Sequence, residues 1–154
     1  MKFLKKLFSI FSSSTENPEE LSHTVLGDER ISRFIFSSDH FKIKEDGNHV
    51  VKYSAFMPSE NTKTASVYRT SILNESEIWG IDKKYVSGLR TDRKVSKARA
   101  DILAKTIFEN SLHILPLRTP HPRHADISNY PAEKGQIKLI AMKIAEASTL
   151  VPKP

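Results

Sequence analysis

Residues 118–131 combine the side chains best suited to chemistry in this chain. Two histidines, two arginines, an aspartate, an asparagine and a tyrosine stand there among three prolines. Pro120 and Pro122 fix their own φ and push the residues before them towards extended conformations. A stiff loop that carries titratable and anion-binding groups is a common setting for recognition or catalysis. We therefore take this segment as the first candidate site.

Anion recognition is the interpretation that needs the fewest coincidences. Arg118 and Arg123 can hold a phosphate or carboxylate through two parallel hydrogen bonds, and a histidine adds a donor that strengthens on protonation. The alternative is internal, because the arginines could instead pair with Asp126, Asp101 or Glu133 and only pin the loop. The predicted anion-binding residues are Arg118, Arg123, His121, His124, Arg99, Arg93 and Lys97.

Metal-independent catalysis on a phosphodiester or phosphoryl ester is a second hypothesis for the same segment. His121 and His124 would act as acid and base, the arginines would stabilise developing negative charge, and Tyr130 would be an auxiliary donor. Any arginine-rich loop with histidines offers the same groups. No catalytic residue is therefore assigned, and a non-enzymatic role is favoured.

A metal or cofactor site has weaker support. His121, His124 and Asp126 have the atom types of a two-histidine, one-carboxylate site, but no histidine follows His124 and the neighbouring arginines would repel a dication. The five glycines are too scattered for a phosphate-binding loop or a dinucleotide fingerprint, and neither Gly-x-Ser-x-Gly nor His-Glu-x-x-His occurs. We expect no metal and no cofactor.

Positive charge is concentrated in residues 83–124. Ten of the chain's 24 lysines and arginines lie there against three acidic residues, whereas residues 17–82 are net negative. Concentrated positive charge attracts polyanions or acidic partners, although many basic segments are only solvated surface. We predict a small binding or accessory protein that engages a polyanion, with nucleic acid as the leading case, or an acidic protein surface. The oligomeric state is left open.

The first eleven residues have the pattern of a short amphipathic, basic helix. Their apolar side chains fall on one face at helical spacing, and three lysines lie off it. Such a helix could attach a scaffold to the membrane surface or enter a partner's groove, or it could dock on the protein's own core. No apolar run approaches a membrane span, so we expect a cytoplasmic protein with peripheral membrane contact as an option. The predicted contact residues are Phe3, Leu4, Leu7, Phe8 and Phe11.

The elements that must position these groups follow a polar linker at residues 12–23, and residues 24–154 are expected to form one globular domain. Asn74 as N-cap and Glu77 at the capping-box position predict a helix to about Val86, which Gly88 ends. Aromatic and β-branched residues, turn residues and apolar periodicity predict the remaining elements: strands at 31–36, 49–57, 64–72 and 113–117, a hairpin turn at 45–48, a helix at 100–110 with a strand near 95–99 left open, and a last helix at 131–148.

The last helix is expected to place Pro131 in its first turn, with Tyr130 or Asn129 as cap. The predicted fold class is α+β, with a mainly antiparallel sheet of about 4–5 strands packed against about three helices. The short amphipathic helix at residues 1–11 would precede this domain.

Two arginines lie inside predicted elements. Arg69 is in the third strand, and Arg99 is beside the second helix. If either points inward it must be paired, because an uncompensated buried guanidinium is costly. Surface salt bridges are the favoured interpretation, since arginine is rarely buried.

Six short segments between Ile31 and Val151 also resemble segments of a group of small uncharacterised bacterial proteins. The resemblance implies a bacterial origin and one shared domain, and it implies no catalytic residue. The segments are Arg33-Phe34-Ile35-Phe36, Ala55-Phe56-Met57-Pro58, Ser66-Val67-Tyr68-Arg69, Glu77-Ile78-Trp79, Arg99-Ala100-Asp101-Ile102 and Pro122-Arg123-His124-Ala125.

Overall fold

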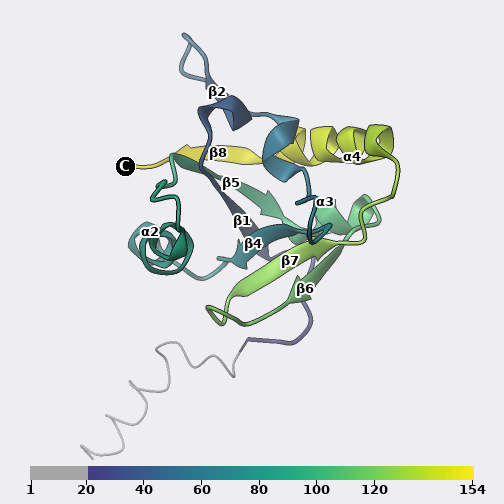
Figure 1. Cartoon of the computed structure of the whole chain (residues 1–154), viewed down its shortest axis with the longest axis horizontal. Helices are drawn as coiled ribbons and strands as arrows, with labels where there is room; N and C mark the ends of the chain where they lie inside the picture. Colours follow the sequence, from purple (N-terminus) through teal and green to yellow (C-terminus); the bar gives the residue numbers. More distant parts are fainter. Residues whose placement is uncertain (1–20) are drawn as a thin grey trace, which may run out of the picture.

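The computed structural model describes residues 21–154, through which a six-stranded antiparallel sheet runs in the order β6-β7-β4-β1-β5-β8 (Figure 1). A separate hairpin of β2 and β3 projects from one end of the molecule. The predicted α+β class is confirmed. The strands are β1 (Arg30–Ile35), β2 (Phe41–Ile43), β3 (His49–Val51), β4 (Ala65–Arg69), β5 (Ala98–Leu103), β6 (His113–Pro116), β7 (His124–Ser128) and β8 (Thr149–Pro152).

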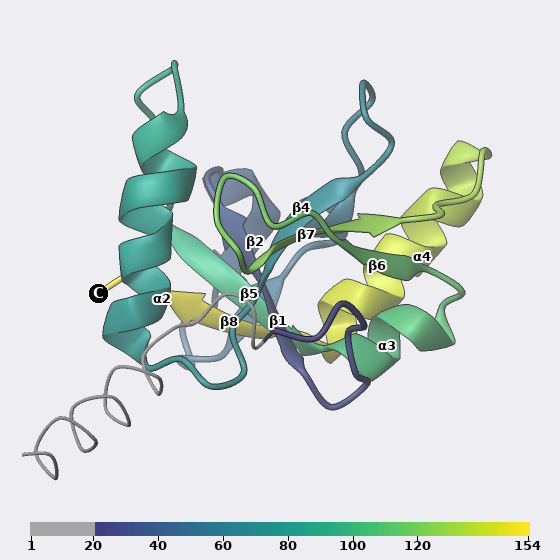
Figure 2. The same ribbon diagram turned by 90° about the horizontal axis from the view of Figure 1, so that it is seen from below.

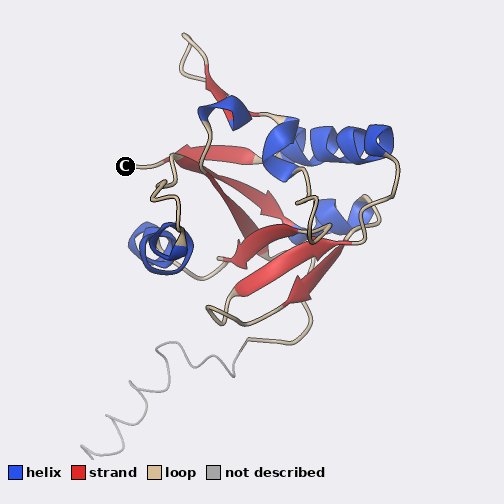
Figure 3. Cartoon of the chain, in the orientation of Figure 1, coloured by secondary structure: helices blue, strands red, loops and turns tan. Residues whose placement is uncertain are grey.

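Helices cover the two faces of the sheet unequally (Figures 2 and 3). One face packs against α3 (Ala104–Glu109) and α4 (Lys134–Ala147), and the other faces α2 (Glu75–Ile81). The helix α2 continues through a π-helical turn, η4 (Asp82–Val86), and a 3-10 turn, η5 (Ser87–Leu89). Two further 3-10 turns are η2 (Ser38–His40) and η3 (Tyr53–Phe56).

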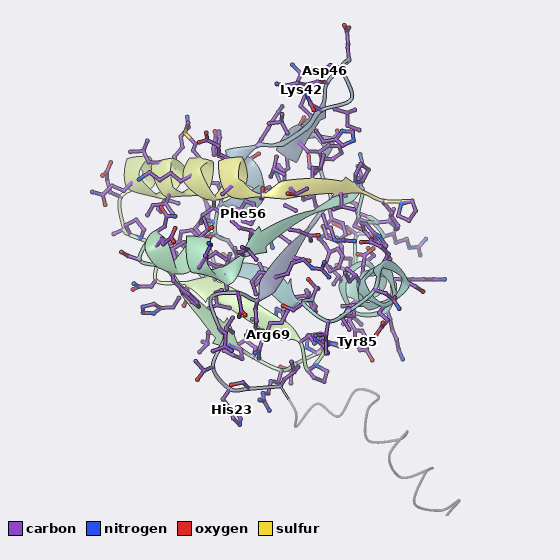
Figure 4. The ribbon with its side chains drawn as sticks, turned by 180° about the vertical axis from the view of Figure 1, so that it is seen from behind. His23, Lys42, Asp46, Phe56, Arg69 and Tyr85 are labelled. Atoms are coloured by element: carbon purple, nitrogen blue, oxygen red, sulfur yellow. The ribbon has the colours of Figure 1, made fainter. Side chains whose placement is uncertain are left out.

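Two hydrophobic clusters follow from the alternation of side chains along β1. Ile31 and Ile35 point into the larger cluster, with Ile144 of α4. Phe34 points the other way and packs with Tyr68 and the α2 residues of the smaller cluster. Figure 4 shows Phe56 in the interior beside α4, whereas Lys42 and Asp46 lie on the projecting hairpin.

The start of α2 matches its prediction because it depends on local chemistry. Asn74 Oδ1 accepts from the Glu77 N–H at 2.9 Å, and Glu77 Oε1 accepts from the Asn74 N–H at 3.3 Å. This reciprocal box satisfies two amides that the first turn leaves without helical partners. The hairpin turn is confirmed in the same way, since Phe41 pairs with Val51 across residues 44–48.

Two predicted elements are wrong in part. The predicted strand at 49–57 ends at Val51, and η3 then buries the neighbouring residues Ala55 and Phe56 together. The predicted helix at 100–110 begins only at Ala104, because residues 98–103 pair with all six residues of β1. Alanine favours helix, but this pairing with a distant strand overrides local propensity.

The candidate loop is also shorter than predicted. Its second half is the strand β7, which alternates buried Ala125 and Ile127 with Asp126. The helix α4 begins at Lys134 rather than Pro131, and its N-cap Glu133 makes no side-chain cap, so neither Tyr130 nor Asn129 has that role. With β8 also present, the main sheet has six strands instead of about 4–5.

The predicted helix at residues 1–11, with its contact residues Phe3, Leu4, Leu7, Phe8 and Phe11, lies outside the described residues. Most of the predicted linker does so too. Within residues 21–154, every helix is too short or too polar to cross a membrane.

Candidate anion-binding site

A pocket of about 600 Å³ lies at the end of β1, between η2 and the segment that precedes β5. Its wall includes six cationic or imidazole side chains and no carboxylate. Phe34, Ile35, Phe36 and Val95 are among the other residues that line it. The electrostatics of this pocket therefore favour an anion. The six basic lining residues are Arg33, His40, Arg90, Arg93, Lys94 and Lys97.

Arg33 supplies a fixed charge because the strands beside it separate. Between β1 and β4 only Ile31↔Arg69 and Ser32↔Tyr68 pair. Beyond them, Arg33 donates from Nε to the carbonyl of Ala55 at 3.0 Å and from Nη1 to the carbonyl of Ser66 at 2.7 Å. Burial lowers the pKa of Arg33, yet arginine stays protonated in proteins.

Arg90 shapes the pocket and is partly neutralised. Its guanidinium carbon lies 4.0 Å from the centre of the Phe36 ring, and its Nη2 is 2.6 Å from Asp92 Oδ2. The hydrogen bond from Arg90, with another from the Lys94 backbone, lowers the pKa of Asp92 to about 2. The Lys94 N–H donates to the same carboxylate at 3.0 Å. Asp92 therefore holds the Arg90 side chain and the Lys94 backbone together within the segment that precedes β5.

Three cationic side chains of the segment that precedes β5 are exposed and form no salt bridge in the described part of the chain, so their charge can act on a ligand. The side chains of Arg93, Lys94 and Lys97 are exposed, and none of them forms a salt bridge within the described residues. Lys97 is held in place by its backbone, whose N–H donates to the Ile35 carbonyl at 2.7 Å. These groups can contact a ligand without breaking an internal ion pair.

His40 completes the basic wall as a titratable group. Burial, followed by the charge of Arg33, lowers the pKa of His40, while Asp39 opposes the shift. The imidazole is therefore largely neutral at neutral pH. A bound anion would favour its protonated form.

Asp82 fixes the ends of the segment that carries the pocket cations. This carboxylate is fully buried and accepts from Ser87 Oγ at 2.8 Å and from Ser96 Oγ in a short hydrogen bond. Ser87 Oγ in turn accepts from the Ser96 N–H at 3.1 Å, and Lys153 Nζ lies 3.6 Å from Asp82. Residues 88–95 are thus a loop closed at its base.

The predicted anion-binding residues do not form one site, because the structure places them in separate regions of the molecule. Arg93 and Lys97 line the basic pocket, but no residue between 118 and 124 does. Arg99 lies neither in the basic pocket nor in the turn at residues 118–124. Its side chain is 1 % exposed and holds both oxygens of Glu75 and both of Asp101 at 2.7–3.1 Å.

Surface salt bridges were the favoured interpretation for two arginines, and that expectation is wrong. Besides Arg99, Arg69 is only 2 % exposed, and it meets Glu29 through Nε and Nη2 and the Ser22 carbonyl through Nη1. The condition that an inward arginine must be paired is met at both positions. Figure 4 shows Arg69 at the base of the sheet.

The two arginines of the β6–β7 turn bind backbone carbonyls. Arg118 donates from Nη2 to the Leu21 carbonyl at 2.7 Å, and Arg123 donates from Nη1 to the Arg69 carbonyl at 3.2 Å. The Arg69 N–H donates back to the Arg123 carbonyl at 3.0 Å. Both side chains therefore help to fasten the turn to its neighbours, and an anion-binding role for them stays a prediction.

The two histidines of the turn lie near one tyrosine ring. The centre of the Tyr68 ring is 6.4 Å from that of His121 and 5.2 Å from that of His124. His121 also packs edge-on against Tyr85 of η4 at 4.8 Å, and its Nδ1 accepts from the Arg123 N–H. Burial, and then the Arg123 charge, lower the pKa of His121.

His124 is held by hydrogen bonds at both ring nitrogens. Nδ1 lies 2.5 Å from the Thr119 carbonyl oxygen, and Nε2 lies 2.8 Å from Ser66 Oγ. Tyr130 is elsewhere, because it packs against the α4-side cluster and donates to the Phe56 carbonyl at 2.9 Å. The structure therefore brings His121 and His124 together but does not bring Tyr130 to them.

Several residues of these sites could not be identified as site residues from the sequence alone. Arg33 is a charged residue within an apolar strand, which is the one signal that could have singled it out. Ser66, Tyr68 and His40 have ordinary surroundings in the chain. Among residues 21–154, no group of three or more metal-ligating side chains is arranged to hold a metal ion.

Comparison with protein-family models, curated proteins and solved structures finds no match for this chain. The resemblance to small bacterial proteins therefore stays an expectation, and the function has to be argued from the geometry above.

Proposed function

We propose that this protein is a binding or accessory protein whose basic pocket holds an anionic ligand without turning it over, with single-stranded nucleic acid as the leading case. The carrying observation is the composition of the wall, where every titratable side chain is a lysine, an arginine or a histidine. The side chains of Arg93, Lys94 and Lys97 form no salt bridge within residues 21–154, so a ligand would displace mainly water and counterions from them.

Apolar surface beside the cations favours a nucleotide over a purely acidic peptide. Val95 is exposed and Phe36 is half-buried at the pocket, with Arg90 stacked on the phenyl ring. A base can rest on such a surface while its phosphate meets the lysines, which is the usual combination in single-strand binding. An acidic peptide would use the charges and leave the apolar wall uncovered.

A fluorescence-anisotropy titration with a labelled single-stranded oligonucleotide tests the proposal. At salt concentrations of about 50 and 200 mM, we expect binding that weakens steeply as salt rises, because phosphate contacts release counterions. Absence of binding at the lower concentration would remove nucleic acid as the ligand. A poly-glutamate peptide run in parallel covers the acidic-partner alternative, and binding of that peptide alone would assign the pocket to acidic proteins.

A further inference from the structure

A serine–histidine pair lies on the sheet face that α2 shares, apart from the residues that line the basic pocket. In the pairing of β4 with β7, Ser66 is opposite Asp126 and Tyr68 is opposite His124. Alternation along both strands places these four side chains on one face. Ser66 Oγ and His124 Nε2 are 2.8 Å apart, which is hydrogen-bond distance.

The Thr119 carbonyl decides which nitrogen of His124 carries the proton. A carbonyl oxygen can only accept, so Nδ1, at 2.5 Å from it, must be the donor. In the neutral ring Nε2 then has a free lone pair, and the Ser66 hydroxyl donates to it. This is the order of groups that activates a nucleophile: a hydroxyl, a base within reach, and a third group that orients the base.

The surroundings keep the base fixed and leave the hydroxyl accessible. The His124 side chain is 13 % exposed and packs on Tyr68, whereas Ser66 is exposed to solvent. Asp126 Oδ1 lies 3.5 Å from Nε2, where its charge would stabilise the imidazolium. Thr64 Oγ1 donates to Asp126 Oδ2 at 2.9 Å and holds that carboxylate in place.

We propose that Ser66 is a nucleophile towards small carboxylic esters, with His124 as its general base. Oγ bonds to the carbonyl carbon while the hydroxyl proton passes to Nε2. The alkoxide leaves with the electron pair of the broken C–O bond and takes that proton. Water then attacks the acyl-serine, its proton passes through Nε2 to Oγ, and the carboxylic acid is released. This activity stands independently of the anion pocket.

Labelling of the full chain with an alkyl fluorophosphonate tests the proposal. Ser66 Oγ would bond to phosphorus as fluoride leaves with the P–F electron pair, and the proton would go to Nε2. Tandem mass spectrometry should locate the adduct on Ser66 and not on Ser76, an exposed serine of α2 that serves as an internal control. Equal labelling of the two serines would overturn the proposal without any variant.

Substitutions then separate nucleophile from base. Ser66→Ala should remove the adduct, and His124→Gln should slow labelling about 100-fold, the lower end of what a general base contributes. Near-UV circular dichroism checks that the aromatic side chains keep their native packing in each variant. Labelling of Ser66 at the wild-type rate in folded His124→Gln would show that the imidazole does not activate the serine.

Discussion

Arg33 donates from Nη1 to the carbonyl of Ser66 at 2.7 Å, across two strands that have ceased to pair. The guanidinium replaces the backbone hydrogen bonds that β1 and β4 would otherwise exchange. Arg33 also lines the basic pocket, so one residue links the separated strands and adds to the positive charge of the pocket.

Arg33→Ala should therefore destabilise the protein. The substitution leaves the carbonyls of Ala55 and Ser66 without their donor, and hydrogen bonds from charged groups contribute about 1.5–3 kcal/mol each. We expect a loss of about 3 kcal/mol in the free energy of unfolding, measured by urea denaturation. Arg93→Ala, an exposed change in the same pocket, is the control and should stay within about 0.5 kcal/mol. Equal effects would contradict the structural role of Arg33.

Arg99 should matter more for stability than its exposed partner. Arg99→Met leaves Asp101 largely buried without its guanidinium, and breaking such a pair costs about 3 kcal/mol. Glu75 is 64 % exposed, so Glu75→Gln should cost about 1 kcal/mol or less. Thermal unfolding of both variants checks the ranking, and a larger loss in Glu75→Gln would reverse it.

Acidification should weaken the same ion pair. The hydrogen bond from Arg99 lowers the pKa of Glu75 from its ordinary 4.5, against a smaller opposing effect of burial. A lowered folded-state pKa gives stability that is complete above the unfolded value and is lost as pH falls through the folded one. Wild-type stability should thus drop below about pH 4.5 by more than that of Glu75→Gln. Parallel curves for the two proteins would contradict this contribution.

Anion affinity should rise as the pH falls from 7.5 towards 5.5. Burial and Arg33 hold the pKa of His40 below 6.5, and a bound anion makes protonation more favourable, so binding and proton uptake are linked. The pH dependence should be smaller in His40→Gln. His121→Gln is the matched control, because His121 does not line the pocket. Titrations at the two pH values would contradict the link if His40→Gln kept the wild-type dependence.

Asp82→Asn should disturb the pocket from a distance. The change removes the buried negative charge and replaces one of the two carboxylate oxygens that accept from Ser87 and Ser96 by an NH2 donor, and we expect roughly 2 kcal/mol of destabilisation together with weaker anion binding. Urea denaturation and oligonucleotide titration measure the two effects on one sample. Unchanged anion affinity in a destabilised variant would show that the loop does not depend on this anchor.

Sequence reasoning succeeded where the determinants are local. Asn74 and Glu77 are three residues apart, and the turn at Gly47, with φ +83°, needs only its immediate neighbours. The last four residues of β5 were predicted as the start of a helix, and a strand was left open only near 95–99, because the conformation of β5 depends on pairing with β1, about 67 residues away along the chain. Local propensity carries no information on that partner.

The candidate site was also predicted only in part, because some of its contacts depend on residues far apart in the sequence. The charge count pointed to the segment that contains Arg93 and Lys97, and this segment lines the basic pocket. The counterions of Arg99 could not be read from the sequence, since Glu75 reaches it from a different element. The histidine-bearing turn was noticed, but the partner of His124, Ser66, comes from a strand more than fifty residues earlier.

The salt dependence of oligonucleotide binding, compared in two matched double variants, decides whether the basic pocket is where nucleic acid binds. Arg93→Ala/Lys97→Ala removes two pocket cations, and Lys134→Ala/Lys143→Ala removes two exposed lysines of α4. The first pair should weaken binding and reduce the slope of log affinity against log salt by about 1.4, or about 0.7 for each lost phosphate contact, while the second leaves the slope unchanged. Equal losses in the two pairs, or no loss in the first, would contradict binding at the pocket.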